Sequence, residues 1–256
     1  MRKLLSIAAM LLFSISVALT QNNVGYEWGK NYGSANNSSS GSKTIADASG
    51  NSYTVGKIVK SSFEPLVFPC LSGVSDNVGN YFLFISKHNA AGDCQWVKTI
   101  RGDDANMEVS GVALDPSGNI FITGYFSRTL IFGDAYFTTT SSGGNDVFVG
   151  KYSNSGDFLW AKNIGGTSDD RGISLATDAS GNVYTTGTFR GTVDFDPGSG
   201  VANLVTGSGS CVFVSKLDAS GNYGWAKILD TNQGNGTGIA LDASGNVYTT
   251  DRRAHV

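Results

Sequence analysis

Histidine, cysteine and proline are scarce in this chain of 256 residues, which holds only 2 histidines, 3 cysteines and 4 prolines. With only His88 and His255, neither a histidine-rich metal site, a Ser-His-Asp triad nor an HExxH motif is expected. Cys70, Cys94 and Cys211 form no CxxC motif, so a zinc or redox site has no support. In an oxidising compartment Cys70 and Cys94 could pair, which would leave Cys211 as a buried thiol.

Long hydrophobic runs are also missing, apart from Leu4 to Leu19. This run follows the basic Arg2-Lys3 and precedes polar residues, so residues 1–20 are predicted to be a secretory signal peptide. It is short for a membrane anchor, and no later segment is apolar enough to span a bilayer. Loss of Arg2 and Lys3 changes the formal net charge from −3 to −5, which argues against nucleic-acid binding. We therefore expect a secreted or cell-surface protein.

Glycine, by contrast, is abundant at 34 residues, and much of it belongs to an internal repeat. The turn-like phrase D-x-S-G-N recurs with aspartates at Asp47, Asp115, Asp178 and Asp242. A second series consists of Trp28, Trp96, Trp160 and Trp225, each two residues before a lysine. Both series have a period of about 64 residues, which is typical of a tandem array. Because the tryptophans occupy one strand position in each repeat, we expect them to pack between neighbouring units.

Each repeat reads as four short strands joined by Asp/Ser/Gly/Asn turns, with room for an extra hairpin between the second and third strands. The predicted fold is therefore all-β: a β-propeller of four-stranded antiparallel blades. The repeat array is expected to cover residues 21–250. Its units are placed at about 44–99, 108–164, 171–229 and 238–250. The small Ala113, Ala176 and Ala240 suit first strands crowded near a central axis.

The pattern "GISLATDASGNVYTTGTF … VFVSKLDASGNYGWAKI" resembles the bacterial SBBP-type β-propeller repeat. The resemblance covers residues 25–250 or so. It implies tandem propeller blades in an exported or cell-surface protein, and it implies no reaction.

Both ends depart from the repeat. Residues 25–33 match the last strand of a unit and are expected to be an orphan strand, whereas residues 251–256 place charge at positions that are elsewhere small or apolar. The chain would then hold three full blades, half of a fourth and one orphan strand. We expect such a chain to be a fragment of a larger protein, with unpaired strand edges that are completed by missing blades or by self-association.

Candidate ligand-binding residues are the acidic pairs in the connections between units, where they would lie at the rim of a central channel. These pairs are Asp103-Asp104 and Asp169-Asp170. They could bind a ligand or cation, or act as an acid and base, or simply form turns. Asp194 and Asp196 are a weaker candidate for Ca²⁺, and a polar hairpin tip explains them equally. No other cofactor is expected.

Three functional hypotheses follow. The first is an exported, non-catalytic scaffold that binds an unknown protein or glycan. The second is a glycan-active enzyme in which Asp103 or Asp169 acts as acid or base. The third is a structural array stabilised by calcium at Asp194 and Asp196. The scarcity of catalytic residue types favours the first.

Overall fold

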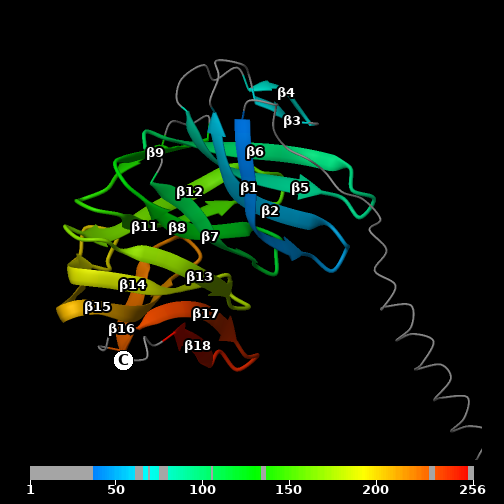
Figure 1. Cartoon of the computed structure of the whole chain (residues 1–256). Helices are drawn as coiled ribbons and strands as arrows, with labels where there is room; N and C mark the ends of the chain where they lie inside the picture. The colour runs from blue at the N-terminus through cyan, green and yellow to red at the C-terminus, as the bar shows by residue number, and fades with distance from the viewer. Residues whose placement is uncertain are drawn as a thin grey trace, which may run out of the picture.

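The computed structural model describes residues 37–60, 66–68, 70–74, 80–104, 106–133, 137–230 and 234–252. Every regular element in these ranges is a β-strand, which confirms the all-β prediction. The strands form antiparallel sheets that succeed one another along the chain, from the blue and cyan top of Figure 1 to its red base. This arrangement is consistent with a propeller. The expected signal peptide, the expected strand at 25–33 and Trp28 lie outside the described residues.

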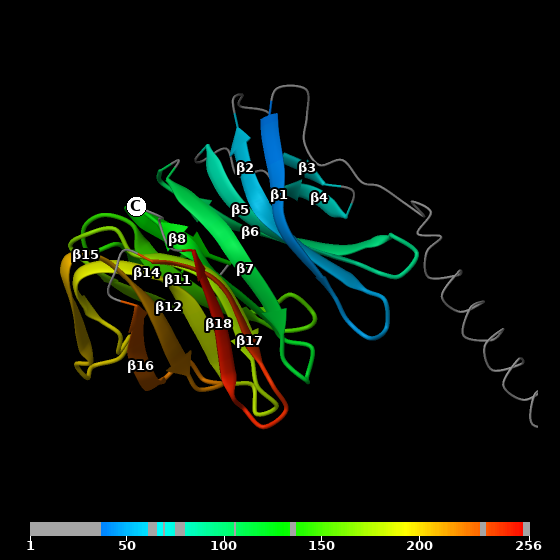
Figure 2. The same cartoon turned by 60° about the horizontal axis from the view of Figure 1, so that its bottom comes forward.

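The described strands group into three four-stranded units and one hairpin, each hydrogen-bonded in chain order (Figure 2). The first unit contains β1 (Asn37–Ala46), β2 (Ser52–Lys60), β5 (Tyr81–His88) and β6 (Cys94–Gly102). The second contains β7 (Met107–Leu114), β8 (Ile120–Phe126), β11 (Asp146–Tyr152) and β12 (Phe158–Gly166). The third contains β13 (Arg171–Thr177), β14 (Val183–Asp194), β15 (Asn203–Leu217) and β16 (Tyr223–Asp230). The hairpin contains β17 (Asn235–Leu241) and β18 (Val247–Arg252).

The D-x-S-G-N phrase forms the turn between the first and second strands of each unit. In the first copy, Asp47 Oδ1 accepts the N–H groups of Ser49 and Asn51 at 2.9 and 3.0 Å, and Oδ2 accepts from the Asn51 side chain at 2.8 Å. Gly50 adopts a φ of 80°, a conformation that glycine tolerates without strain. The same bonds recur at Asp115, Asp178 and Asp242. The repeated phrase is therefore a structural turn.

An additional hairpin follows the second strand of each complete unit. These hairpins comprise β3 (Leu66–Phe68) with β4 (Leu71–Val74), β9 (Thr129–Phe132) with β10 (Phe137–Thr140), and the extended ends of β14 and β15. In the second unit, β9 pairs with β6 of the unit before it. In the third, the end of β14 pairs with β12 at Gly165 and Gly166. Each of these two hairpins thus joins its own unit to the preceding one.

Side chains of the outer strands complete the contact between units. Trp96 Nε1 donates to the Asn154 carbonyl of the second unit at 3.2 Å, and Trp160 Nε1 donates to the Ala219 carbonyl of the third at 3.2 Å. A hydrophobic cluster also crosses the second boundary, because Val147 of the second unit packs with residues of the third. The inter-unit packing expected of Trp96 and Trp160 is therefore present in the structure.

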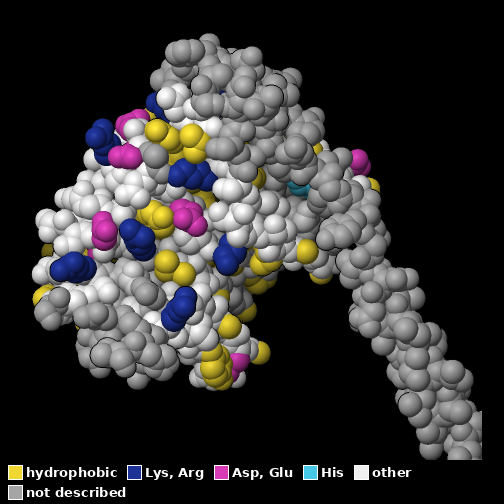
Figure 3. Space-filling model, in the orientation of Figure 1, with side chains coloured by type: hydrophobic (Ala, Val, Ile, Leu, Met, Phe, Trp, Pro, Cys, Tyr) yellow, Lys and Arg dark blue, Asp and Glu magenta, His cyan; other side chains and the backbone are white. Residues whose placement is uncertain are grey.

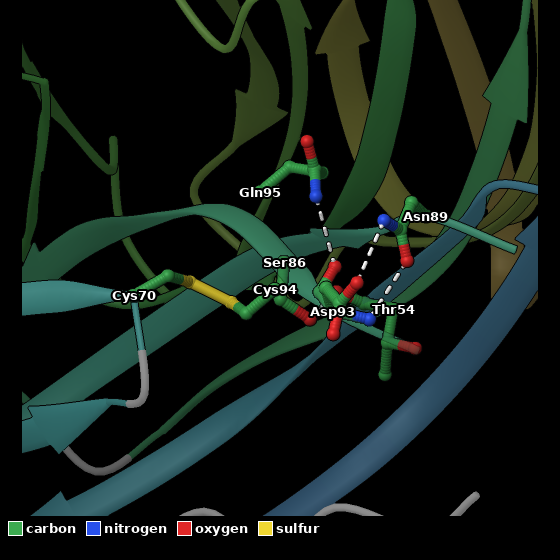
Figure 4. The surroundings of a disulfide bond; sticks show 7 residues. All are labelled: Thr54, Cys70, Ser86, Asn89, Asp93, Cys94 and Gln95. Carbon is green, nitrogen blue, oxygen red and sulfur yellow. Dashed lines mark hydrogen bonds between the residues drawn. A yellow bond between two sulfur atoms is a disulfide. The ribbon is translucent and has the colours of Figure 1, made fainter. Parts of the chain in front are cut away.

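Cys70 and Cys94 form a disulfide that ties the β3–β4 hairpin to the start of β6 (Figure 4). Beside Cys94, the Asp93 N–H and carboxylate bind the Asn89 side chain at 2.8 and 3.0 Å. Cys211 is free and buried. The pairing considered from the sequence is the one that the structure contains.

Two element boundaries differ from the expected ones. β1 begins at Asn37, earlier than residue 44, because the Ser/Gly-rich stretch 37–42 pairs with β2 although its composition is typical of a loop. β18 continues through Asp251 and Arg252, which pair with Gly236 and Asn235. Backbone pairing in a ladder does not depend on side-chain polarity, and both residues are exposed, so their charges remain in solvent.

Candidate functional site

The first strands of successive units lie next to one another, so that β1 contacts β7, β7 contacts β13 and β13 contacts β17 (Figure 1). Each of them contains an irregularity at the same place in its register with the second strand. The residue skipped there is Ser42, Ser110, Ile173 or Thr237. Such β-bulges re-aim side chains and are frequent beside functional sites.

These bulges converge on one pocket of about 600 Å³. All four bulge residues line it, together with Ser40, Gly41, Lys43, Glu108, Tyr125, Arg171 and Ser174. The pocket therefore lies among the innermost strands of four successive units. Its lining is rich in hydroxyl groups, with one carboxylate and two cationic side chains.

Glu108, Tyr125 and Arg171 form the charged part of this pocket. The Tyr125 hydroxyl donates to Glu108 Oε2 at 3.1 Å, and the Arg171 guanidinium lies 4.7 Å from the centre of the Tyr125 ring. Burial and the neighbouring Glu108 carboxylate raise the pKa of Tyr125, so its hydroxyl stays protonated and remains a donor. Arg171 also approaches Asp169, with Nη2 3.6 Å from Oδ2. Arg171 is therefore held at the pocket while its side chain stays partly exposed.

In the three complete units a glycine of the second strand accommodates the bulge, whereas Asp251 occupies this position in the β17–β18 hairpin. Gly56, Gly124 and Gly187 lie opposite the bulges, and a Cβ atom at these positions would come within 2.1, 1.8 and 1.9 Å of the carbonyl oxygen of Ser40, Glu108 and Arg171 respectively. No side chain fits there. Glu108, Tyr125 and Arg171 were not identified from the sequence as candidate site residues. The sequence does carry a signal for this site. The residue whose carbonyl lies against the repeated glycine changes from Ser40 to Glu108 to Arg171, while the surrounding repeat stays the same.

The four rim carboxylates proposed from the sequence lie in inter-unit connections, but in different surroundings. Asp103 is exposed, and Asp104 is paired with Arg128 at 3.3 Å. Asp169 contacts Arg171 of the pocket. Asp170 is fully buried, and both of its oxygens accept backbone N–H groups, from Gly166 at 2.7 Å and from Arg190 at 3.0 Å. Of the four, only Asp169 is connected to the pocket by a recorded side-chain contact.

The family comparison agrees with this arrangement. Residues 95–125 match the family model of the SBBP beta-propeller repeat. The matched stretch runs from β6 through the inner strand β7 and nearly to the end of β8. It therefore contains Glu108 and Tyr125 of the pocket. The match supports a propeller repeat in this part of the chain, and it names no ligand.

Two curated relatives are similar to part of the chain. An uncharacterized WD repeat-containing protein of Acanthamoeba polyphaga mimivirus is 31% identical over 107 residues, which is 36% of this chain and 8% of the relative. The regulatory protein FlaEY of Caulobacter vibrioides is 28% identical over 111 residues, which is 43% of this chain and 12% of the relative. The chain thus spans about a tenth of the length of these relatives.

Burial also distinguishes a second polar cluster, at the boundary between the second and third units. Asp146 and Asp170 are both 0% exposed. Burial raises the pKa of Asp146, and burial together with the charges of Asp146 and Asp169 raises the pKa of Asp170 to about 7. Among the described residues, neither has a cationic partner within salt-bridge distance. This repeat array therefore buries two acids, and among the described residues no positive side chain pairs with either of them.

Asp194 and Asp196 are the weaker calcium candidates: Asp194 is the last residue of β14, and Asp196 lies in the tip that follows. Asp194 Oδ1 accepts the N–H groups of Asp196 and Ala202, at 3.0 and 2.8 Å. Asp196 Oδ1 accepts the Gly198 N–H at 2.8 Å. Turn formation accounts for these bonds. Within the described ranges, no three His, Cys, Asp or Glu side chains cluster in a way that would hold a metal.

The surface shows two further features. Over the face drawn in Figure 3, Lys and Arg side chains are interspersed with Asp and Glu rather than gathered into one patch. In the part of the chain that the structure describes, no helix is long and apolar enough to cross a membrane.

Proposed function

We propose that this protein is an exported, non-catalytic β-propeller scaffold that binds its ligand in the pocket formed by the inner strands. The observation that carries the proposal is the pattern of variation around the pocket. The turns, outer tryptophans and glycines repeat from unit to unit, whereas the position facing the pocket is Ser40, Glu108 or Arg171. A shared frame with different side chains at one place is what a binding scaffold requires.

The lining favours a polar ligand with hydroxyl and carboxylate groups. Arg171 offers a planar set of donors for a carboxylate, and Lys43 adds a second positive charge. Glu108 and the serine hydroxyls accept or donate bonds to hydroxyl groups, and the Tyr125 ring supplies a flat surface. Acidic glycans and acidic protein side chains both present such groups.

The export proposal has support of two kinds. The sequence begins with a signal-like segment, and the Cys70–Cys94 disulfide belongs to an oxidising compartment. The number of blades in the closed ring is also a proposal. Among the described residues β18 pairs only with β17, and we propose that strands from a longer chain or from a second copy complete this unit.

The function is tested with an array of neutral and acidic glycans and acidic peptides. We expect the protein to bind ligands that carry carboxylates, and Arg171→Gln to weaken binding at least about tenfold, or about 1.4 kcal/mol. Arg128→Gln is the matched control, since Arg128 pairs with Asp104 away from the pocket. Binding that is unaffected by both Arg171→Gln and Glu108→Gln would remove the pocket from the function, and release of sugar fragments from the array would indicate an enzyme instead.

A further inference from the structure

The buried acids at the boundary between the second and third units have no counterpart in the other repeats. Asp146 lies opposite Phe126 in the sheet register, and the residues at the same register position in the first and third units are Phe82 and Cys211. Asp170 lies two residues before Gly172, which pairs with Gly187. The corresponding residue of the second unit is Met107, which is buried. The Asp146 position is therefore apolar in the other complete units, and the Asp170 position carries Ser39 in the first unit and Met107 in the second. Neither position carries an acid there, so the two buried carboxylates require another explanation.

Unpartnered oxygen atoms lie on Asp146 and on two asparagines that are hydrogen-bonded to the acids. Asp146 Oδ1 and Asn145 Oδ1 are buried without a hydrogen-bond partner, and so is Asn163 Oδ1. Asp146 and Asn145 are 0% and 2% exposed, so neither oxygen is compensated by bulk water. An uncompensated buried carboxylate oxygen is costly. All three atoms are acceptors, which means that the missing partner carries positive charge or hydrogen.

The orientation of the two amides is fixed by what their nitrogen atoms bind. Asn145 Nδ2 donates to Asp169 Oδ1 at 3.1 Å. Asn163 Nδ2 donates to the Thr140 carbonyl at 3.0 Å and to Asp146 Oδ2 at 3.3 Å. Turning either amide over would place an oxygen against an oxygen, so the unpartnered atoms are the carbonyl oxygens.

The cluster is compact and joins two units. The Asp146 carboxylate lies against the backbone of Gly165, where a Cβ atom would come within 2.5 Å of either carboxylate oxygen. The next residue, Gly166, donates its N–H to Asp170, and the Asp170 N–H donates to the Asn145 carbonyl at 2.6 Å. The backbone N–H of Arg190 in the third unit also donates to Asp170. The acceptors thus gather where β12 meets the end of β14.

We propose that this boundary binds one Ca²⁺ ion, with Asp146 and Asp170 as the charged ligands and the amide oxygens of Asn145 and Asn163 as neutral ones. Carboxylate and amide oxygens are the ligands that Ca²⁺ prefers. A proton would satisfy one oxygen, whereas a cation satisfies several at once. Mg²⁺ retains several waters and demands octahedral geometry, which a buried site made from protein oxygens does not offer. The ion would link the second unit to the third.

Isothermal titration calorimetry of the full chain after chelator treatment tests the proposal, with CaCl₂ and MgCl₂ titrated separately. We expect one Ca²⁺ per chain, weaker or no binding of Mg²⁺, and a melting temperature that rises with Ca²⁺ concentration. Asp146→Asn and Asp170→Asn should each weaken Ca²⁺ binding at least about tenfold, because ligand charge sets the affinity of such sites.

Asp103→Asn is the control, because Asp103 is an exposed acid in the equivalent inter-unit connection. Asn163→Ala keeps both carboxylates and should weaken binding even if the aspartate variants do not fold. Absence of Ca²⁺ binding by the wild-type chain up to about 10 mM, above the range of about 0.1–1 mM for extracellular calcium modules, would overturn the proposal. So would binding that is lost in Asp194→Asn but kept in Asp146→Asn, since that result would place the ion at the hairpin tip.

Discussion

Phe195 offers a direct test of how the extra hairpins hold neighbouring units together. It follows β14, is 0% exposed, and its ring centre lies 5.3 Å from that of Phe189 and 5.0 Å from that of Phe213. The same cluster includes Val147 and Ile164 of the second unit. Phe195→Ala therefore removes a side chain from the centre of the boundary between two units.

The expected cost follows from this burial. Replacing a fully buried phenylalanine by alanine costs about 3–5 kcal/mol, which combines the lost transfer free energy with the cavity left behind. A domain is stable by only about 5–15 kcal/mol, so the loss is a large fraction of the total. In a repeat array, stability depends on each unit and on the interfaces between neighbours. Weakening one interface should therefore broaden or split the unfolding transition as well as lower its midpoint.

Urea denaturation followed by tryptophan fluorescence and circular dichroism measures both effects. Val205→Ala is the matched control, because Val205 lies on the same hairpin with 61% of its surface exposed and should change stability by less than about 0.5 kcal/mol. Phe195→Leu keeps most of the volume and should fall between the two. A cost of less than about 1 kcal/mol for Phe195→Ala, or one no larger than that of Val205→Ala, would show that the hairpin does not hold the two units together.

The remaining predictions concern acid and reductant. Hydrogen bonds from the Asn51 and Asn246 side chains lower the pKa of Asp47 and Asp242 below the usual 3.8, so their stabilising contribution is present above that pH and is lost as the pH falls through the lower folded pKa. The melting temperature should fall progressively below about pH 4, and Asp242→Asn should reduce this pH dependence. A melting temperature that stays constant from about pH 5 to 2 would contradict the prediction. Reduction of the Cys70–Cys94 disulfide, with a sequence separation of 24, should cost about 3 kcal/mol by chemical denaturation, whereas the Cys70→Ser, Cys94→Ser double variant should not respond to reductant.

Much of the frame was predictable because local chemistry is repeated. An aspartate that accepts two backbone N–H groups and a glycine with positive φ form the same turn wherever they occur, so Asp47 and Asp178 could be assigned from the sequence alone. The tryptophans were assigned by their constant phase, and Trp96 and Trp160 indeed contact the following unit. The start of β1 was missed, because pairing with β2 outweighs the low strand propensity of the Ser/Gly-rich stretch.

The pocket could not be predicted to the same extent. Its walls are placed by β-bulges, and a bulge changes the register by one residue without a distinctive residue type. Ser42, Ser110 and Thr237 carry hydroxyl groups, which are common throughout the repeat, and Ile173 carries none. Each acidic pair was predicted as one candidate site because its two residues are adjacent in sequence. Yet Asp169 is half-exposed at the pocket, whereas Asp170 is fully buried at the boundary between units. Neighbours in a strand or connection point to different sides, so adjacency gives little information about shared function.

Register within the repeat separates the roles of these aspartates more reliably than residue type does. Asp47, Asp115, Asp178 and Asp242 recur at one position, and each makes the same turn, so their role is structural. At other positions the residue changes between units while the backbone pairing is retained. At the pocket, Glu108 of the second unit and Arg171 of the third occupy equivalent positions. At the buried boundary, Asp146 of the second unit occupies the position of Phe82 in the first. A polar residue that occupies an otherwise apolar register position lowers stability unless something binds it. The pocket and the boundary between the second and third units are therefore the two places where this repeat array is best suited to bind a ligand and an ion.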